Sequence, residues 1–280
     1  MPSALWAWAT VGFVFCGSKD ELVAVLPGLR PRYSDPRLSP YDALSSVGKD
    51  EAADPYSFGQ SLVRRIKQYD RQELGTHTLS HFYCLEEGGT PDAFAADLDA
   101  AKAMAATSGV TLKSIVFPRN QICRDHLRVA RARGLIAFRG NPRVWFHRAC
   151  PEAEQTIPKR ALRLADTYVP AAGHHVHEPE EAEGMVDVPA SRFLRPVRGV
   201  WYERFQFDRI VGEMTAAAKA RKLFHLWWHP HNFGADPDAN LSFLKRILDV
   251  YASLQDRFGM RSLNMSEVAE GVLRCAKPSS

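Results

Sequence analysis

The sequence repeats one pattern along most of its length, in which a short apolar run ends in a polar break and an amphipathic stretch follows. The first run, Trp6 to Phe15, is nearly continuous and rich in aromatic and β-branched residues, which is typical of a parallel strand buried on both faces. Ser18-Lys-Asp-Glu21 follows with the spacing of a capping box, so a helix is expected directly after the strand. This order of strand and helix predicts an α/β fold.

Further apolar runs carry the pattern to the end of the chain. We expect strands in the run that ends at Thr76 and at residues 112–117, 135–138, 223–228 and 261–264. Helices between them are indicated by one apolar face each, most clearly from Asn240 to Phe258, where Gly259 ends the pattern. Thr90-Pro91 opens another helix with an N-cap and a proline at the first position. Six strands alternating with helices predict a parallel sheet that is closed or nearly closed into a barrel.

Two stretches lack this periodicity. Residues 27–55 are rich in proline and polar residues, so we expect a long loop with little regular structure. Residues 140–206 also contain many prolines, and we predict an irregular insertion with at most one helix. Because no linker divides the chain, residues 1–280 are predicted to form one domain that includes this insertion.

Composition limits the class of protein. With 280 residues and 45% hydrophobic residues, the chain can bury a sizeable core. The net charge of +4 comes from scattered Lys and Arg without a long basic run, so we expect solvated helix faces and no nucleic-acid partner. Five widely spaced cysteines without a Cys-x-x-Cys pair indicate reduced thiols and a cytoplasmic location. The apolar stretch from Ala4 to Cys16 is too short to span a bilayer, and a signal peptide is the alternative to a buried strand there.

Two histidines follow the apolar run that ends at Thr76. His77 and His81 are four residues apart, so their rings can reach one metal ion from adjacent helical turns or across the bend after a strand. The hydroxyl groups of Thr76, Thr78 and Ser80 are expected to hydrogen-bond the ring nitrogens that the metal leaves free. The alternative is one surface histidine and one core histidine with satisfied hydrogen bonds.

Other chemically active residues also lie where predicted strands end. Arg119 follows the strand 112–117, and His229 follows the strand 223–228. Because chemistry in such barrels gathers at the carboxyl ends of the strands, His77, Arg119 and His229 are expected to share one site. A second cluster, Gly-His-His-Val-His at 173–177, lies in the irregular stretch, and a solvated loop is favoured there over a metal site.

Four motifs in this order resemble those of the NodB-type polysaccharide deacetylases, the carbohydrate esterases of family four. They are His77-Thr-Leu-Ser-His81, Ser114-Ile-Val-Phe-Pro-Arg-Asn-Gln121, Ala137-Phe-Arg-Gly-Asn141 and Leu223-Phe-His-Leu-Trp-Trp-His-Pro-His-Asn-Phe233. The Phe-Pro-Arg-Asn and His-Pro-His-Asn variants resemble a bacterial subgroup associated with surface-polysaccharide synthesis. The resemblance covers the chain from about Ala7 to its end, and it implies a distorted seven-stranded (β/α) barrel whose first strand is missing.

The resemblance implies a hydrolase that removes acetyl groups from an N- or O-acetylated sugar in exopolysaccharide biosynthesis. His77 and His81 would hold a divalent metal ion, with zinc as the expected ion, and His229 would be the general acid. Arg119 would orient an acidic partner. The residues that would line the substrate cleft are Asn120, His231 and Asn232. A metal ion with an open position can polarise an acetyl carbonyl and activate a bound water.

The chain departs from that family at its first motif, an aspartate pair that supplies the general base and the third metal ligand. The sequence contains no Asp-Asp pair, and Asp35, Asp42 and Asp54 are the nearest candidates to replace it. The resemblance places the missing strand upstream of Met1, so we expect a misplaced start, with a naturally shortened chain as the alternative. An open barrel has two unpaired edges, so this 280-residue form is expected to be poorly soluble or partly unfolded when expressed alone.

Two other functions remain open at this stage. A catalytically inactive family member would bind a glycan or a partner protein through the same cleft. Hydrolysis of a non-sugar C–N bond is a further alternative, because the loops that would form the pocket walls have the least regular patterns. The sequence does not predict an oligomeric state.

Overall fold

The computed structural model describes residues 4–169 and 172–275, and a parallel sheet lies at its centre. The strands are β1 (Ala7–Thr10), β2 (Glu73–Thr76), β3 (Ser114–Ile115), β4 (Ala137–Phe138), β5 (Glu180–Ala182), β6 (Met185–Asp187), β7 (Arg192–Phe193) and β8 (Leu226–Trp227). Six of them form one sheet in the order β1-β2-β3-β4-β6-β5. Its pairs are parallel except β5 with β6, which is antiparallel, and β7 and β8 form a separate parallel pair.

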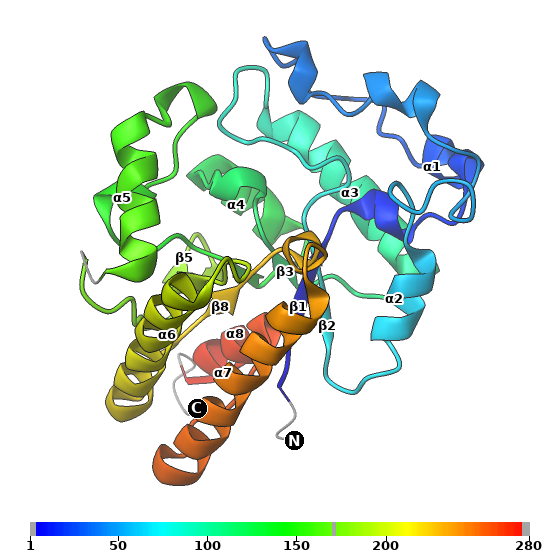
Figure 1. Cartoon of the computed structure of the whole chain (residues 1–280). Coiled ribbons are helices and arrows are strands. Elements are labelled where there is room, and N and C mark those ends of the chain that lie inside the picture. The colour runs from blue at the N-terminus through cyan, green and yellow to red at the C-terminus, as the bar shows by residue number, and fades with distance from the viewer. Residues whose placement is uncertain (1–3, 170–171, 276–280) are drawn as a thin grey trace.

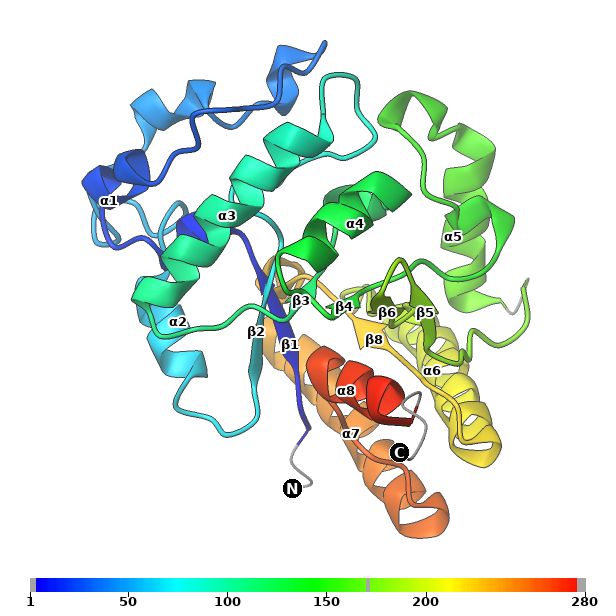
Figure 2. The ribbon, with the colours of Figure 1, turned by 180° about the vertical axis from the view of Figure 1, so that it is seen from behind.

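Helices cover this sheet on more than one side. They are α1 (Lys19–Ala24), α2 (Gln60–Ile66), α3 (Pro91–Thr107), α4 (Arg124–Ala132), α5 (Ile157–Tyr168), α6 (Val200–Ala220), α7 (Pro237–Phe258) and α8 (Met265–Cys275). The long helices α6 and α7 lie in front of the strands in Figure 1, whereas α3 and α4 lie in front in Figure 2. Among the described residues, none of these helices is both long enough and apolar enough to cross a bilayer.

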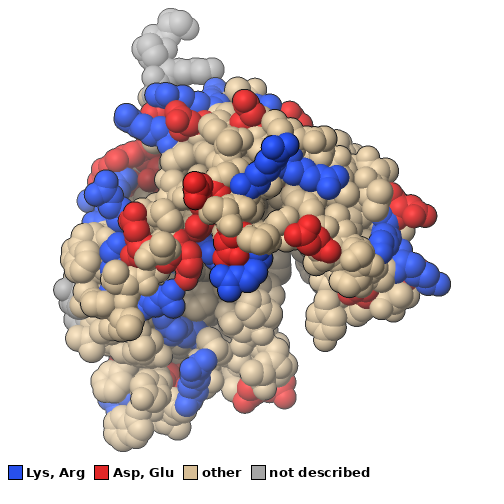
Figure 3. Space-filling view, turned by 90° about the horizontal axis from the view of Figure 1, so that it is seen from above, with Lys and Arg blue, Asp and Glu red and all other residues tan. Residues whose placement is uncertain are grey.

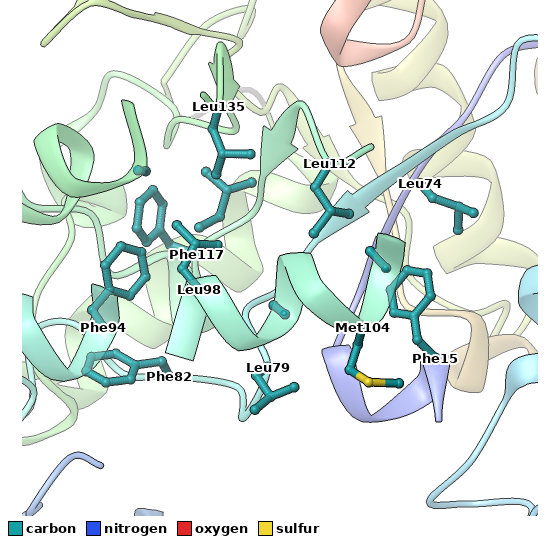
Figure 4. Packing of buried hydrophobic residues seen from close by; sticks show 14 of the residues in the cluster. Phe15, Leu74, Leu79, Phe82, Phe94, Leu98, Met104, Leu112, Phe117 and Leu135 are labelled. Atoms are coloured by element: carbon teal, nitrogen blue, oxygen red, sulfur yellow. The ribbon is translucent and has the colours of Figure 1, made fainter. Parts of the chain in front are cut away.

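The apolar core has three parts. The largest packs α3 and α4 against the strands and includes Phe82, Phe94 and Phe117, which Figure 4 shows from close by. A second part lies between α6 and α7 and includes Ile210 and Phe243, and a third joins α8 to β4 and β6. Each fully buried Leu, Ile or Phe side chain stabilises the fold by roughly 1.5–3 kcal/mol, so the contacts among helices and strands account for most of the stability.

The predicted helix starts are confirmed where a side chain caps the helix. The Ser18 hydroxyl accepts a hydrogen bond from Glu21 N at 3.3 Å, and the Glu21 carboxylate accepts one from Gly17 N at 2.7 Å. Thr90 caps α3 by accepting from Ala93 N at 3.3 Å. These local interactions therefore form as the spacing predicts.

The last predicted strand, residues 261–264, is wrong. Its backbone hydrogen-bonds a side chain in place of a neighbouring strand, because Ser262 N donates to the Tyr251 hydroxyl at 2.9 Å. Asn264 accepts from Glu267 N at 2.9 Å and thereby caps α8. The segment consequently serves as a helix cap and makes no ladder hydrogen bonds.

The first predicted strand is shorter and less buried than expected. Only Ala7–Thr10 is extended, and Gly12–Phe15 forms a 3-10 helix. β1 lies at the edge of the sheet and its residues remain partly exposed. Gly12 approaches the backbone of Leu79 so closely that a Cβ atom would lie 2.9 Å from Leu79 Cα, which explains why the chain turns at a glycine.

Closure into a barrel is not observed among the described residues. No ladder hydrogen bonds join β1 to β8, or the six-stranded sheet to the β7–β8 pair. Side chains bring the two ends together instead, because Trp6 packs edge-to-face on Trp228 with ring centroids 4.8 Å apart. The structure therefore shows a mixed α/β fold with a parallel sheet, and the seven-stranded barrel with a missing strand stays a prediction.

Residues 140–206, which the sequence pattern predicted to be an irregular insertion, contain regular elements. They contain α5 and three strands of only two or three residues, which are too short to produce a visible periodicity. One of them, β6, pairs with β4 and extends the parallel sheet. Of this stretch, β5 and β6 therefore belong to the central sheet, whereas β7 pairs with β8.

A buried charge network holds α5, α6 and β7 together. Asp166 lies 3.1 Å from Arg192 Nη1 and 3.4 Å from Arg209 Nη2, and Glu213 accepts from Arg192 Nε at 3.0 Å. None of these four residues is more than 5% exposed. Two guanidinium groups balance two carboxylates, which is how a protein interior accommodates charge.

Replacing one member of this network tests its contribution to stability. We expect Asp166→Ala to lower the free energy of unfolding by about 3–5 kcal/mol, because two arginines would lose a buried partner. Urea unfolding measures the change. Asp35→Ala is the matched control, since the Asp35–Arg37 pair is solvent-exposed and should contribute little. Equal stability of the two variants would contradict a structural role for the network.

Candidate active site

Chemically active side chains follow four strands at one edge of the molecule. His77 comes directly after β2, Arg119 lies four residues after β3, Arg139 comes directly after β4, and His229 lies two residues after β8. β2, β3 and β4 are parallel neighbours, so their carboxyl ends lie at the same edge. Figure 3 looks down on the face that is uppermost in Figure 1, and it shows a hollow with acidic and basic side chains beside it.

The two histidines of the predicted metal pair lie side by side. Their ring centroids are 4.7 Å apart. His77 Nδ1 lies 2.6 Å from the Val116 carbonyl oxygen, which can only accept, so the proton of the neutral ring is on Nδ1. His81 Nδ1 lies 3.0 Å from the Tyr83 hydroxyl. In each ring these contacts leave Nε2 as the atom for a metal ion.

Both rings are neutral at neutral pH. Burial lowers the pKa of His77 to about 3, with further contributions from the charges of His81, Arg139 and His229. Burial also lowers the pKa of His81 to about 4, with contributions from Arg119 and His229. A metal ligand must be the deprotonated imidazole, so this environment favours metal binding over protonation.

The loop between the histidines has an uncommon backbone conformation. Thr78 and His81 adopt φ values of 66° and 60°, which non-glycine residues rarely do. Hydroxyl groups stabilise the loop, because Thr76 Oγ1 accepts from Thr78 N at 2.9 Å and Thr78 Oγ1 accepts from Phe82 N at 2.7 Å. We expected the hydroxyl groups of Thr76, Thr78 and Ser80 to hydrogen-bond the histidine rings, and this expectation is wrong among the described residues. These hydroxyl groups contact backbone N–H groups and Asp97 instead.

Asp97 on α3 organises the same loop and was missed by the sequence analysis. Its carboxylate accepts hydrogen bonds from Leu79 N at 2.7 Å and Ser80 N at 3.2 Å, and also contacts the Ser80 hydroxyl. Burial raises the pKa of Asp97 to about 6, while the hydrogen bonds from Ser80 and Leu79 oppose this increase. The available signal was a carboxylate on the apolar face of α3, beside Phe94 and Leu98.

Two arginines lie near the histidines, and their surroundings differ. Arg119 is partly exposed, stacks over the Tyr83 ring at 4.5 Å, and has Glu86 and Glu152 at 3.8 and 3.6 Å. Arg139 is only 8% exposed and has no acidic partner among the described residues. Burial lowers its pKa to about 9. A buried arginine without a carboxylate is costly, so Arg139 is the stronger candidate for a functional role.

Arg139 connects the ends of three strands. Its Nη2 donates to Asn120 Oδ1 at 2.7 Å, and its guanidinium lies 4.0 Å from the Trp227 ring centroid. Its Nε is buried and has no partner in the described part of the chain. Arg139 lay within a motif identified from the sequence, but only the packing shows that it is buried, whereas Arg119 is partly exposed.

The segment after β8 supplies the remaining predicted residues. The His229 ring lies 5.5 Å from Trp227 and stacks at 5.2 Å on the exposed His231. Burial lowers the pKa of His229, and the charges of His231 and Arg139 lower it further. Asn232 N donates to His229 O at 3.0 Å, which holds this turn, and its Oδ1 is buried without a partner among the described residues. The charge of His229 contributes to the lowered pKa of both His77 and His81, whereas no direct contact with that pair is seen for His229, His231 or Asn232 among the described residues.

The described residues do not complete a three-ligand set around His77 and His81. One group of three elsewhere in residues 4–169 and 172–275 has metal-binding spacing, with the donor atoms of His147, Asp166 and His175 within 4.8 Å of one another. His175 already contacts Asp166 at 2.7 Å, and the same carboxylate pairs with Arg192. A cation there would compete with arginine, so the buried charge network explains this group better.

The carboxylates named as substitutes for the aspartate pair have other partners or positions. Asp35 pairs with Arg37 at 2.8 Å, and Asp54 accepts from Gly48 N at 3.1 Å. Asp42 lies in a 3-10 helix at Asp42–Ser46. None of them belongs to a three-ligand group in the part of the chain that the structure describes.

The histidine cluster at 173–177 is not a solvated loop, which corrects the sequence-based expectation. His175 and His177 are 3% and 8% exposed, and only His174 is exposed to solvent. His175 is buried because it bonds Asp166, and His177 because its backbone pairs with Leu223. Burial lowers the pKa of His177 to about 4.

A solved structure shares this fold. The chain aligns with the crystal structure of a "putative polysaccharide deacetylase" from Mycobacterium smegmatis at a TM-score of 0.54 and 12% identity, covering 100% of this chain and 95% of the other. No family model and no curated protein matches the sequence. At this identity the likeness establishes the α/β fold and no more.

The role of Asp97 can be tested without touching the histidines. We expect Asp97→Asn to lower the free energy of unfolding by about 1–3 kcal/mol, because the loop would lose charge-assisted hydrogen bonds. Zinc affinity should fall by roughly 10-fold to 100-fold as the ring positions loosen. Urea unfolding and zinc titration measure the two effects. Asp99→Asn, an exposed position on the same helix, is the control, and equal behaviour of both variants would refute the assignment.

Proposed function

We propose that the protein is a metal-dependent hydrolase that removes acetyl groups from an N- or O-acetylated sugar. The main support for this proposal is the pair His77 and His81. In each ring Nδ1 has a hydrogen-bond partner, so Nε2 is left for a metal ion. The fold shared with the polysaccharide deacetylase structure supports the same class of reaction. An acetylated saccharide is accordingly the proposed substrate, and exopolysaccharide biosynthesis the proposed process.

The histidine pair fits a metal ion in part. Zinc binds imidazole nitrogens, and catalytic zinc sites use three protein ligands and one open position. His77 and His81 would be two of those ligands, and the described residues add no third. When bound, the ion would polarise the acetyl carbonyl and activate a water molecule.

Side chains of this chain can perform the remaining tasks. The buried guanidinium of Arg139, which has no acidic partner among the described residues, can stabilise negative charge that develops on the acetyl oxygen. His229 can deliver a proton to the leaving amine or hydroxyl once its ring is protonated, and because its pKa is lowered the neutral ring predominates at neutral pH. The proposed substrate contacts are Asn120, His231 and Asn232, and Arg119 is proposed to orient an acidic partner.

Histidine variants separate metal binding from turnover. We expect His77→Ala and His81→Ala to lose both zinc binding and acetate release, because each removes a proposed ligand. His229→Ala should keep zinc and reduce turnover by roughly 10²–10⁴-fold. Zinc titration and acetate release from acetylated oligosaccharides measure these effects, with His174→Ala as the exposed-histidine control. Full activity of His77→Ala would exclude the proposed site.

A matched pair of arginine variants tests the assignment of Arg139. Arg139→Met keeps an apolar stem of similar length but removes the charge, and we expect kcat to fall by about 10²–10³-fold. Arg119→Met should have a much smaller effect, because the charge of Arg119 is already balanced by Glu86 and Glu152, which lie 3.8 and 3.6 Å away. Unchanged zinc binding in both variants would show that the site is intact. A larger loss in Arg119→Met would transfer the role to Arg119.

A second function is favoured by one observation. The missing third ligand among the described residues leaves open a protein that binds an acetylated glycan without hydrolysing it. This alternative predicts saturable glycan binding that is independent of zinc, together with no acetate release when zinc is supplied. Acetate release that depends on His77 would exclude it.

A further inference from the structure

The start of α6 exposes several aromatic side chains to solvent. Trp201, Tyr202 and Phe205 are 72%, 58% and 52% exposed. Tyr168, at the end of α5, packs edge-to-face on Tyr202 with ring centroids 5.5 Å apart. Most large aromatic side chains of the chain are buried or half-buried, so this group marks a surface with a binding role.

A cavity of about 220 Å³ opens between these two helices. Its lining residues are Tyr168, His174, Phe205, Asp208 and Arg209. The volume is below the roughly 300–1,000 Å³ typical of pockets for drug-sized molecules, so the cavity suits a single ring. Aromatic faces, a carboxylate, an imidazole and a guanidinium therefore meet in a space of that size.

One lining residue has an unsatisfied hydrogen-bond donor. Arg209 is only 5% exposed, and its Nε is buried without a partner in the described part of the chain. Its other contacts reach the buried charge network through Asp166 and Glu213. A buried N–H without an acceptor is unfavourable, so a ligand oxygen that reached Arg209 would be stabilised by it.

We propose that the cavity between α5 and α6 is a saccharide-binding site, separate from the strand-end site. A sugar ring presents C–H groups on its faces, which pack on Tyr168 and Phe205, and hydroxyl groups at its rim, which match Asp208 and Arg209. The exposed Asp208 carboxylate disfavours an anionic lipid surface. The fit is therefore to a neutral or N-acetylated sugar within an oligosaccharide.

The cavity is connected to the candidate active site by one segment. Phe193 on β7 lies 4.6 Å from Trp227 and 5.8 Å from His229, ring centroid to ring centroid. Arg195, two residues later, lies over Phe193 at 5.8 Å and donates to Thr167, the neighbour of Tyr168. One series of side-chain contacts therefore runs from the end of α5 to His229.

The test uses the whole chain with the metal removed by chelation, so that turnover does not consume the probe. Calorimetric titration with the N-acetylglucosamine tetramer and with cellotetraose measures binding. We expect Phe205→Ala and Asp208→Asn each to weaken binding roughly tenfold, because each removes one contact at the centre of the site. Tyr56→Ala, which truncates a 99% exposed tyrosine elsewhere, should bind as the unaltered protein does.

Several results would contradict the proposed saccharide-binding site. Absence of binding of both probes, or equal binding by Phe205→Ala and the unaltered protein, would overturn the proposal. Sedimentation with phosphatidylglycerol vesicles, or self-association, that is lost in Phe205→Ala would assign the surface to a membrane or to a second copy. Failure of the proposed function can be distinguished from failure of this site. A protein that releases no acetate but still binds the tetramer would contradict the proposed function and retain the saccharide site.

Discussion

The carboxylate of Asp97 is the contact on which the candidate site most depends. It lies in the largest apolar cluster and joins α3 to the loop that carries His77 and His81. The loop has left-handed backbone conformations that would not persist without strong external hydrogen bonds. A buried carboxylate with several donors stabilises such a loop because it has no competing contact with water. The positions of both rings consequently follow from packing between helix and sheet.

Buried arginines occur in two kinds of surroundings, and the contrast separates structure from chemistry. Arg192 and Arg209 share two carboxylates, so their charges are balanced within the fold. Arg139 is equally buried but has an amide oxygen and an aromatic face as its partners. Cation–π contact and one hydrogen bond compensate only partly for lost hydration. The unbalanced positive charge therefore makes the strand-end site suited to an anion or to developing negative charge.

The stretch 140–206 joins this site to the outer surface of the molecule. It contributes β6 to the central sheet and, through β7, places Phe193 beside Trp227 and His229. It also carries α5 and the start of α6, which line the proposed saccharide cavity. One segment therefore borders both the candidate active site and the proposed cavity.

Local features were predictable from the sequence. The caps at Ser18 and Thr90, the end of α7 at Gly259 and the histidines after β2 each depend on residues a few positions apart, so spacing was sufficient. The positions of Arg119 and His229 after strands also followed from the pattern. The fold class was reached by the same reasoning, although the pattern did not reveal strands of two residues.

Only the tertiary structure decided which groups meet. Nothing near Asp97 in the sequence indicates that its carboxylate bonds the loop at Leu79 and Ser80, and nothing near Arg139 indicates burial without an acid. The cluster at 173–177 became a buried one because Asp166 lies beside it in space. The sequence by itself determined helix starts, apolar faces and candidate ligands, since those are short-range. Burial, charge pairing and the choice between two arginines required the fold, because they depend on contacts between distant segments.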